Sequence, residues 1–242
     1  SKGNRQQMKI KNKVDLSLNR EDFYKKYKKN KTASIYTLGC KVNQYESNAI
    51  ANLLENEGYE IVDFESEADV YIINTCTVTG ISARKSRQMI RKAVTLKRKQ
   101  NEEAVIVAAG CYPQTAPQEI SAIEDVDIIT GTKDKNKIID YIKNYSKCNK
   151  KQINAVGDIT KAKDFEELHV DNYKDRTRAY IKIQEGCNQY CSYCIIPYTR
   201  GPIRSRKPED VVNEAKKLAD NGFLEIELIG IHLASYGKDL GY

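Results

Sequence analysis

Short apolar runs alternate with stretches of helical period along residues 32–146. The run 104–109 is continuously apolar, which is typical of a strand buried on both faces of a sheet. The expected strands are residues 34–38, 60–64, 70–74, 104–109 and 126–130, and the expected helices are residues 44–56, 82–99, 117–123 and 134–145. This alternation predicts an α/β domain with a doubly wound parallel sheet.

The helix expected over residues 44–56 has typical start and stop signals. Asn43 and Glu46 have the spacing of an N-cap residue and its capping-box partner. Gly58 supplies the residue type that commonly follows a helix C-terminus. The helix is therefore expected to begin after Asn43 and to end before Gly58.

Charge is concentrated at the N-terminus. The chain has a formal net charge of +7, and residues 1–31 hold 11 Lys and Arg against 3 Asp and Glu. We expect this segment to be a basic leader, read either as a solvated tail or as a contact for nucleic-acid phosphates. Residues 147–176 are polar and weakly periodic, which indicates a linker with one extended piece over 165–170.

Composition excludes several classes of protein. Hydrophobic residues make up 40% of the 242 residues, which is usual for a globular chain and unlike a disordered one. No apolar run approaches the roughly 18 residues of a membrane span, and the N-terminus lacks the apolar segment of a signal peptide. We therefore expect no membrane association and a cytoplasmic location.

The seven cysteines carry most of the chemical information. An odd number without an export signal argues against a disulfide framework. In a reducing compartment, thiolates are soft ligands for iron–sulfur clusters and zinc. Cys148 stands alone in the polar linker and is expected to be a free thiol, whereas the other six form two triplets.

The first triplet follows three expected strands. Cys40, Cys76 and Cys111 each stand directly after the end of a strand. Because the carboxyl ends of parallel strands meet at one edge of a sheet, these thiols should converge. A single cysteine at such a place is more often a small buried side chain, but three at equivalent positions favour a metal or cluster site with one open coordination position.

The second triplet has the spacing C-x3-C-x2-C and consists of Cys187, Cys191 and Cys194. It follows residues 179–184, whose alternation predicts a half-buried strand. A zinc site would need a fourth ligand, and the chain has only two histidines. Three cysteines can instead hold a 4Fe–4S cluster with one free iron that chelates S-adenosylmethionine, and structural zinc remains the alternative.

After the second triplet the pattern predicts a helix over 208–221 and a strand over 225–229. Strand, cysteine loop, helix and strand are the order in which a βα barrel with its site at the strand ends begins. Residues 177–242 are therefore expected to be the start of a barrel, which they are too short to close.

Several motifs together resemble one known family, the radical S-adenosylmethionine methylthiotransferases. The motifs are residues 37–47 (TLGCKVNQYES), 74–79 (NTCTVT), 109–111 (AGC) and the C-x3-C-x2-C loop. Residues 39–44, 84–88 and 230–232 look most like the branch that modifies N6-threonylcarbamoyladenosine in tRNA. The resemblance implies an N-terminal methylthiotransferase domain over 32–146 followed by a radical barrel.

The resemblance also implies a reaction with two 4Fe–4S clusters. Cys187, Cys191 and Cys194 would hold the cluster that cleaves S-adenosylmethionine to methionine and a 5′-deoxyadenosyl radical. The auxiliary cluster, whose sulfur is methylated by a second S-adenosylmethionine, would be held by Cys40, Cys76 and Cys111. The radical would abstract hydrogen from C2 of the adenine at tRNA position 37. A flavodoxin-like one-electron donor and a sulfur source are implied partners.

Two further residues would contact S-adenosylmethionine in this resemblance. Tyr193, directly before the last cysteine, would line the adenine of the cofactor. Gly230 lies at the end of the second barrel strand, where many radical enzymes carry a Gly-Gly-Glu motif and this chain has Gly-Ile-His. The group that holds the amino end of the cofactor is therefore left open.

Arginines give candidate contacts with RNA phosphates. The helix over 82–99 has many basic residues and no acidic one, and it follows Cys76. A merely solvated basic face is the alternative interpretation. The candidate RNA-binding residues are Arg84, Arg87, Arg91, Arg204 and Arg206.

Other functions stay open on the sequence alone. The same cluster ligands would serve a methylthiotransferase that acts on isopentenyladenosine in tRNA or on a ribosomal protein. A non-enzymatic, metal-stabilised nucleic-acid-binding module is a further alternative. Because two barrel strands cannot enclose a reactive site, residues 1–242 alone are expected to bind the auxiliary cluster, hold the radical cluster weakly and form no methylthiolated product.

Overall fold

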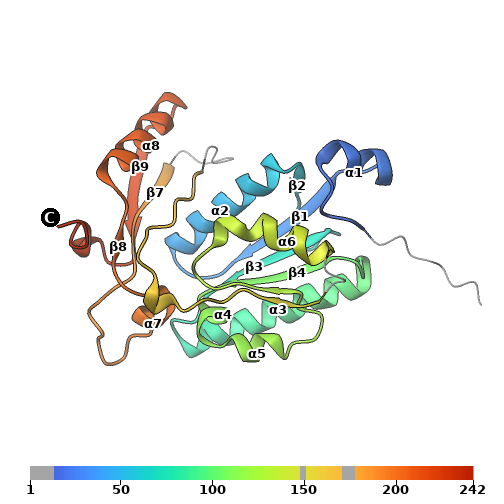
Figure 1. The fold of residues 1–242 in the computed structure, drawn as a ribbon, viewed down its shortest axis with the longest axis horizontal. Coiled ribbons are helices and arrows are strands. Elements are labelled where there is room, and N and C mark those ends of the chain that lie inside the picture. Colours follow the sequence, from blue (N-terminus) through green and yellow to red (C-terminus); the bar gives the residue numbers. More distant parts are fainter. Residues whose placement is uncertain (1–13, 148–150, 171–177, 242) are drawn as a thin grey trace, which may run out of the picture.

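A six-stranded parallel sheet forms the first part of the molecule (Figure 1). The computed structural model describes residues 14–147, 151–170 and 178–241. The strands of this sheet are β1 (Lys31–Thr37), β2 (Tyr59–Ile61), β3 (Val70–Thr75), β4 (Val105–Gly110), β5 (Ile128–Ile129) and β6 (Ile153–Asn154). They lie in the order β2-β1-β3-β4-β5-β6, and each neighbouring pair is parallel.

Helices cover both faces of this sheet (Figure 1). They are α1 (Arg20–Tyr27), α2 (Lys41–Asn56), α3 (Gly80–Gln100), α4 (Cys111–Thr115), α5 (Pro117–Ser121), the 3-10 turn η1 (Lys135–Lys137) and α6 (Ile138–Lys147). Successive side chains of β3 point to opposite faces, so Ile72 packs in the core under α2 and α6 while Tyr71 packs in the core under α3 and α5. Both cores are apolar, and the predicted doubly wound parallel sheet is confirmed.

A smaller three-stranded sheet forms the second part. Its elements are β7 (Arg178–Glu185), α7 (Ile196–Arg200), β8 (Arg204–Ser205), α8 (Pro208–Asp220), β9 (Glu225–Gly230) and the 3-10 turn η3 (Leu233–Ser235). β7 lies between β8, which is antiparallel to it, and β9, which is parallel to it. The β7–α8–β9 crossover is the expected βα unit.

One apolar core joins the two parts. Val42 and Tyr45 of α2 pack with Ile181 of β7 and Leu218 of α8, all of them buried. In Figure 1, α2 lies between the large sheet and the sheet of β7, β8 and β9. Full burial of such a side chain stabilises the fold by about 1.5–3 kcal/mol, so this shared core holds the two sheets together.

The segment expected to be a basic leader is partly folded. Leu16 and Phe23 are buried in the core of the large sheet, and Asn19 accepts a hydrogen bond that caps α1. Lys31 begins β1, is buried, and donates to the Leu18 carbonyl. Residues 14–31 are therefore packed on the large sheet, and the folded domain begins before the expected boundary at residue 31. The first 13 residues, with five of the basic side chains, lie outside the described residues.

The expected linker also contributes to the fold. β6 adds a strand to the sheet, and η2 (Ile159–Lys161) packs near α7. Residues 165–170 form no strand, yet Leu168 and Val170 are buried in the shared core. The expected boundary at residue 146 is therefore too early. Cys148 lies outside the described residues.

Two local predictions are wrong. α2 begins at Lys41 with Cys40 as its N-cap, so Asn43 lies inside the helix and its side chain is buried. Glu46 makes no capping-box contact, because buried basic side chains surround it. β7 is buried on both faces from Ile181 onward, so its alternation does not mark a solvent-exposed face.

None of the helices in the described ranges combines the length and the apolar character that a bilayer crossing requires.

Candidate functional site

The cysteines of the first triplet lie at one edge of the large sheet, as predicted. Cys40 follows β1, Cys76 follows β3 and Cys111 begins α4 directly after β4. These three strands are neighbours in the sheet. The thiols of Cys76 and Cys111 are buried, whereas Cys40 is exposed. The structure therefore brings the expected ligands to one edge, with one of them open to solvent.

Gly39 allows the end of β1 to approach Cys76 closely. A Cβ at this position would lie 3.2 Å from the Cys76 sulfur and 3.0 Å from the Asn43 amide nitrogen. Its φ of +109° is in the region that side chains rarely adopt. Gly110, directly before Cys111, has a φ of +98°, and a Cβ there would lie 2.6 Å from the Asn74 side-chain oxygen. The glycines thus leave room where the cysteines meet.

Asn43 fixes the backbone that leads to two of the cysteines. Its side-chain amide donates to the Leu38 carbonyl at 2.7 Å and to the Thr75 carbonyl at 2.9 Å. These residues precede Cys40 and Cys76. A residue expected to cap a helix therefore holds the ends of β1 and β3 at a set separation.

Thr75 and Ser86 complete this support. The Thr75 hydroxyl donates to the Ala109 carbonyl at 2.6 Å and accepts from the Tyr112 amide at 3.3 Å, so it spans the chain around Cys111. The Ser86 hydroxyl accepts from the Cys76 amide at 3.1 Å and donates to the Cys76 carbonyl at 2.8 Å. Buried polar groups of this kind normally find partners, and here the partners hold the cysteine backbone.

The donor set consists of three thiols, which are ligands suited to soft metals and iron–sulfur clusters. In the described part of the chain, no group of three or more His, Cys, Asp or Glu side chains is placed to hold one metal ion. Ligands of an iron–sulfur cluster bind separate irons and therefore need not converge on one point. Burial raises the pKa of the Cys111 thiol, and the positive charges of Arg200 and Lys135 act against that rise. Three thiols with positive charge nearby suit an anionic iron–sulfur group.

The second triplet lies on the loop between β7 and α7. Cys187 is buried and its amide donates to the Gly201 carbonyl at 3.0 Å, while the amide of Cys194 donates to the Cys191 carbonyl at 2.9 Å. Cys191 is exposed. Both ends of the loop are thus fixed, and its middle cysteine is open to solvent.

The expected cofactor contacts differ in their surroundings. Tyr193 is 91% exposed, so its contact with an adenine stays a prediction. Gly230 instead lines a cavity of about 380 Å³ that Cys40 also lines. Ile196, two residues after Cys194, is a further lining residue. This mainly apolar cavity therefore brings residues near both triplets together.

Buried charges connect the two parts beside the first triplet. Arg200 donates to Glu46 at 2.5 Å and to Glu185 at 2.6 Å. Lys135 pairs with Glu46 at 2.9 Å, and Arg204 pairs with Glu185 at 3.3 Å. Burial alone would raise the pKa of Glu185, but the surrounding lysines and arginines outweigh it and hold the pKa well below its ordinary value of 4.5.

Sequence reasoning did not find these charged residues as parts of the site. A lysine and a glutamate at Lys182 and Glu185, within an apolar strand, were the available signal. For Arg200 and Glu46 no signal was available, because 154 residues separate them.

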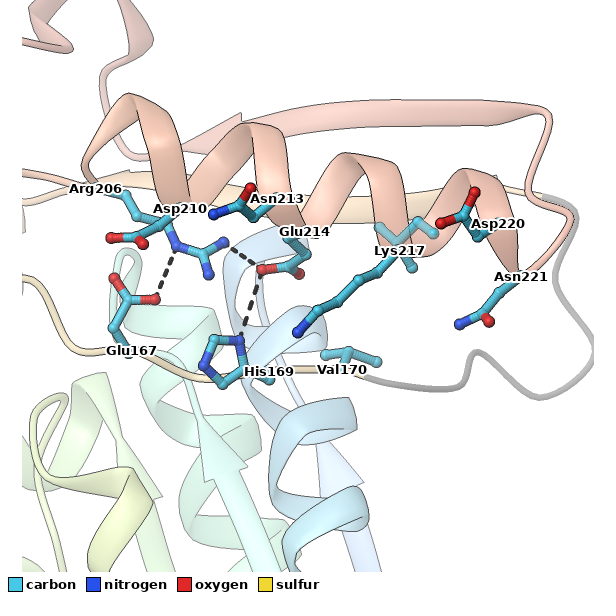
Figure 2. A pocket seen from close by; sticks show the side chains of 11 residues that line it. Glu167, His169, Val170, Arg206, Asp210, Asn213, Glu214, Lys217, Asp220 and Asn221 are labelled. Atoms are coloured by element: carbon cyan, nitrogen blue, oxygen red, sulfur yellow. Dashed lines mark hydrogen bonds and ion pairs between the residues drawn. The ribbon is translucent and has the colours of Figure 1, made fainter.

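Arg204 and Arg206 are corrections to the expected RNA contacts, because both side chains are buried. Arg206 donates to Glu167 at 2.8 Å and also pairs with Glu214. Figure 2 shows these groups in a cavity of about 570 Å³ between α8 and the segment before Val170. Both side chains are thus enclosed by the protein, and Arg206 is paired with two carboxylates, so neither arginine is available to phosphates.

The three candidate arginines of α3 fall into two groups. Arg87 donates to the Tyr112 hydroxyl at 2.7 Å and lies 3.6 Å from Glu119, so it is held within the protein. Arg84 and Arg91 are exposed, and neither has an acidic partner within 4.0 Å among the residues the structure describes. Only the second group is placed for contact with a large anionic partner.

Comparison with known proteins identifies two regions of the chain. Residues 32–131 match the model of uncharacterized protein family UPF0004, and residues 181–241 match that of the radical SAM superfamily. The first region contains Cys40, Cys76 and Cys111, and the second contains the C-x3-C-x2-C loop. The chain is thus similar to UPF0004 over its α/β domain and to the radical SAM superfamily over its second part.

Individual relatives give a more specific similarity than the two family models. The chain is 52% identical over 209 residues to the threonylcarbamoyladenosine tRNA methylthiotransferase MtaB of Bacillus subtilis (strain 168), covering 86% of this chain and 45% of that relative. It is 38% identical over 216 residues to the tRNA-2-methylthio-N(6)-dimethylallyladenosine synthase of Clostridium novyi (strain NT), covering 87% and 46%. The expected resemblance is confirmed, and the chain spans less than half the length of these relatives.

A solved structure supports the fold. The radical S-adenosylmethionine methyltransferase TsrM from Kitasatospora setae, with cobalamin and a 4Fe-4S cluster bound, matches with a TM-score of 0.58 and 15% identity. The match covers 88% of this chain and 52% of that one, and it shows likeness of fold alone.

Proposed function

We propose that this chain is part of an enzyme that methylthiolates C2 of N6-threonylcarbamoyladenosine at position 37 of tRNA. The observation that carries the proposal is the pair of cysteine triplets, one at the strand ends of the α/β domain and one on the β7–α7 loop. The 52% identity to MtaB of Bacillus subtilis supports this substrate over the dimethylallyl nucleoside of a 38% identical relative.

Each triplet would hold one 4Fe–4S cluster. Cys187, Cys191 and Cys194 would hold the cluster that binds S-adenosylmethionine, and the first triplet would hold the auxiliary cluster. The bound groups would supply reductive cleavage of S-adenosylmethionine and the sulfur for transfer. The chain itself fixes the ligands, through the hydrogen bonds of Asn43 and Ser86 at the first triplet.

The cavity between Cys40 and Gly230 is the proposed place for the reacting base. Val42, Val78 and Ile196 give it an apolar lining, which would exclude water from reactive species. A planar base suits such a lining, because its faces are apolar and its edges need few partners. The position of the cavity beside Cys40 would place that base near the auxiliary cluster.

Arg84 and Arg91 are the proposed RNA contacts. Both are exposed on α3, the helix that follows Cys76. In full-length protein, replacing both by Glu should lower the slope of log affinity for tRNA against log salt by roughly one unit per lost phosphate contact. Lys151→Glu combined with Lys163→Glu, at two exposed lysines elsewhere, makes the same change in overall charge and is the control. An unchanged slope would assign the α3 face to solvent.

The remaining participants are also proposals. A flavodoxin-like protein would supply the electron, a separate source would supply sulfur, and the reaction would take place in the cytoplasm. Residues 1–242 alone are proposed to form no product, because three strands do not enclose a site.

Metal analysis and product analysis test the function together. Anaerobically reconstituted full-length protein should hold about eight irons per chain, and about four after replacement of Cys40, Cys76 and Cys111 by alanine. Mass spectrometry of nucleosides from tRNA should show the methylthio product only with all six cysteines. A colourless zinc-containing protein would favour the nucleic-acid-binding module, and product only from isopentenyladenosine tRNA would favour the other tRNA branch.

A further inference from the structure

Arg200 carries a positive charge from the second part of the molecule to the first triplet. It ends α7, six residues after Cys194, and its side chain is buried. Besides its bonds to Glu46 and Glu185, it donates to the Asn43 side-chain oxygen. The same Asn43 amide holds the chain before Cys40 and Cys76, so one guanidinium is connected through Asn43 to the backbone near two cysteines of the first triplet.

Arg200 also lies beside the third ligand of the first triplet. Its helix, α7, packs directly against α4, which begins at Cys111. Cys111 raises the pKa of Arg200 more than any other charge does, although burial acts in the opposite direction. Burial raises the pKa of the Cys111 thiol, and the positive charge of Arg200 acts against that rise.

The buried charges around Arg200 do not balance. Two carboxylates, Glu46 and Glu185, are surrounded by four basic side chains, all at most 1% exposed: Lys135, Lys182, Arg200 and Arg204. Even with Glu166 ionised, positive charge is in excess, and burial raises the pKa of that carboxyl.

Arg200 Nε and Arg204 Nε lack a hydrogen-bond acceptor among the described residues, and Lys182 Nζ makes only longer ion pairs, 3.5 Å to Glu185 and 3.6 Å to Glu46. A buried positive excess is costly unless an anion compensates it. Three thiolates around an iron–sulfur core would make such an anion next to Arg200.

We propose that Arg200 is a positioning residue for the auxiliary cluster, whose charge beside Cys111 raises the reduction potential of that cluster. The inference rests on the proposed assignment of the cluster to the first triplet. Reduction adds one electron from a low-potential donor and no proton, so the cluster becomes more negative by one charge. A fixed positive charge in a water-poor site therefore favours the reduced form.

The test uses full-length protein in which Cys187, Cys191 and Cys194 are alanine, so that only the auxiliary cluster remains. Its potential is measured by dithionite titration followed by electron paramagnetic resonance. Arg200→Gln should shift the reduction equilibrium toward the oxidised form about tenfold or more, which is about 59 mV for one electron. Arg200→Lys should restore most of the potential, because it keeps the charge.

Arg178→Gln is the matched control. Arg178 lies on β7, half-exposed, in an ion pair with Glu225 at 2.8 Å, and its loss should leave the potential unchanged. An Arg200→Gln protein with about four irons and the original potential would overturn the inference. Equal shifts in both glutamine variants would also overturn it.

A second variant guards against misfolding, because removing Arg200 alone leaves a buried carboxylate with one fewer positive partner. Glu46→Gln combined with Arg200→Gln removes both charges of the pair. Its potential should still fall, because Arg200 lies on α7, which packs against the helix that begins at Cys111. An unchanged potential in this double variant would overturn the inference. A background protein without iron would overturn the cluster assignment itself, and this inference with it.

Discussion

Asn43→Ala removes the side chain that joins the ends of β1 and β3. The carbonyl oxygens of Leu38 and Thr75 each lose a donor, at 2.7 and 2.9 Å, and Arg200 loses one of its acceptors. A buried acceptor left without a partner costs about 1–3 kcal/mol. Arg200 keeps Glu46, so the buried Thr75 carbonyl sets the expected loss at about 1–3 kcal/mol, and the part-buried Leu38 carbonyl adds less.

This loss is large against the roughly 5–15 kcal/mol by which a domain is normally stable. The free energy of unfolding is measured by urea denaturation followed by circular dichroism. Asn213→Ala, at an exposed position of α8, should change the free energy by less than about 0.5 kcal/mol. Iron binding by the first triplet should fall with Asn43→Ala, because the backbone before Cys40 and Cys76 loses its support. A free energy within 1 kcal/mol of the unmodified protein would refute this reasoning.

Three further predictions concern backbone, pH and thiol access. Gly110→Ala should destabilise the fold by several kcal/mol and reduce iron binding, because its Cβ would meet the Asn74 side-chain oxygen at 2.6 Å. Gly157→Ala, whose Cβ would have nothing within 4 Å, should do neither. Equal melting temperatures of the two variants would contradict this. Since the pKa of Glu185 is lower in the folded state, its ionised form stabilises the fold above pH 4.5, and this stability is lost as the pH falls. Acid titration of Glu185→Gln should therefore show lower stability at neutral pH and a shallower loss below pH 4.5 than the unmodified protein. In cluster-free protein, iodoacetamide should label exposed Cys40 well before buried Cys111, as mass spectrometry would show; equal rates would place both thiols in solvent.

The sequence predicts the elements whose apolar runs are long. The run that became β4 is buried throughout, and its end at Gly110 locates Cys111. α1 was missed because Phe23 is the one residue of this helix that is buried, within a basic segment. β6 was missed because two residues are too few to show a period of two. Short elements depend on tertiary contacts that local patterns do not record.

The sequence was enough to predict the positions of the candidate ligands in the fold, but not the charged side chains that surround them. The sheet fixes the place of a cysteine that follows a strand, so the local sequence pattern is enough to predict the position of Cys76. Glu46 has the spacing of a capping box, and only the packing of α7 against the α/β domain explains its burial. Arg206 likewise has the composition of an RNA contact, but Glu167 and Glu214 neutralise it. Charge partners distant in sequence decide which basic residues face a ligand.

The charged contact of α2 with β7 and α7 limits how this protein can be recombined with others. Glu46 belongs to the region that matches UPF0004, whereas Glu185 and Arg200 belong to the region that matches the radical SAM superfamily. A hybrid joined at the linker would place foreign side chains opposite Glu46 inside a closed, water-poor contact. A hybrid that folds therefore has to keep Glu46 together with residues 181–241, which means that side chains on both sides of the linker have to come from the same protein.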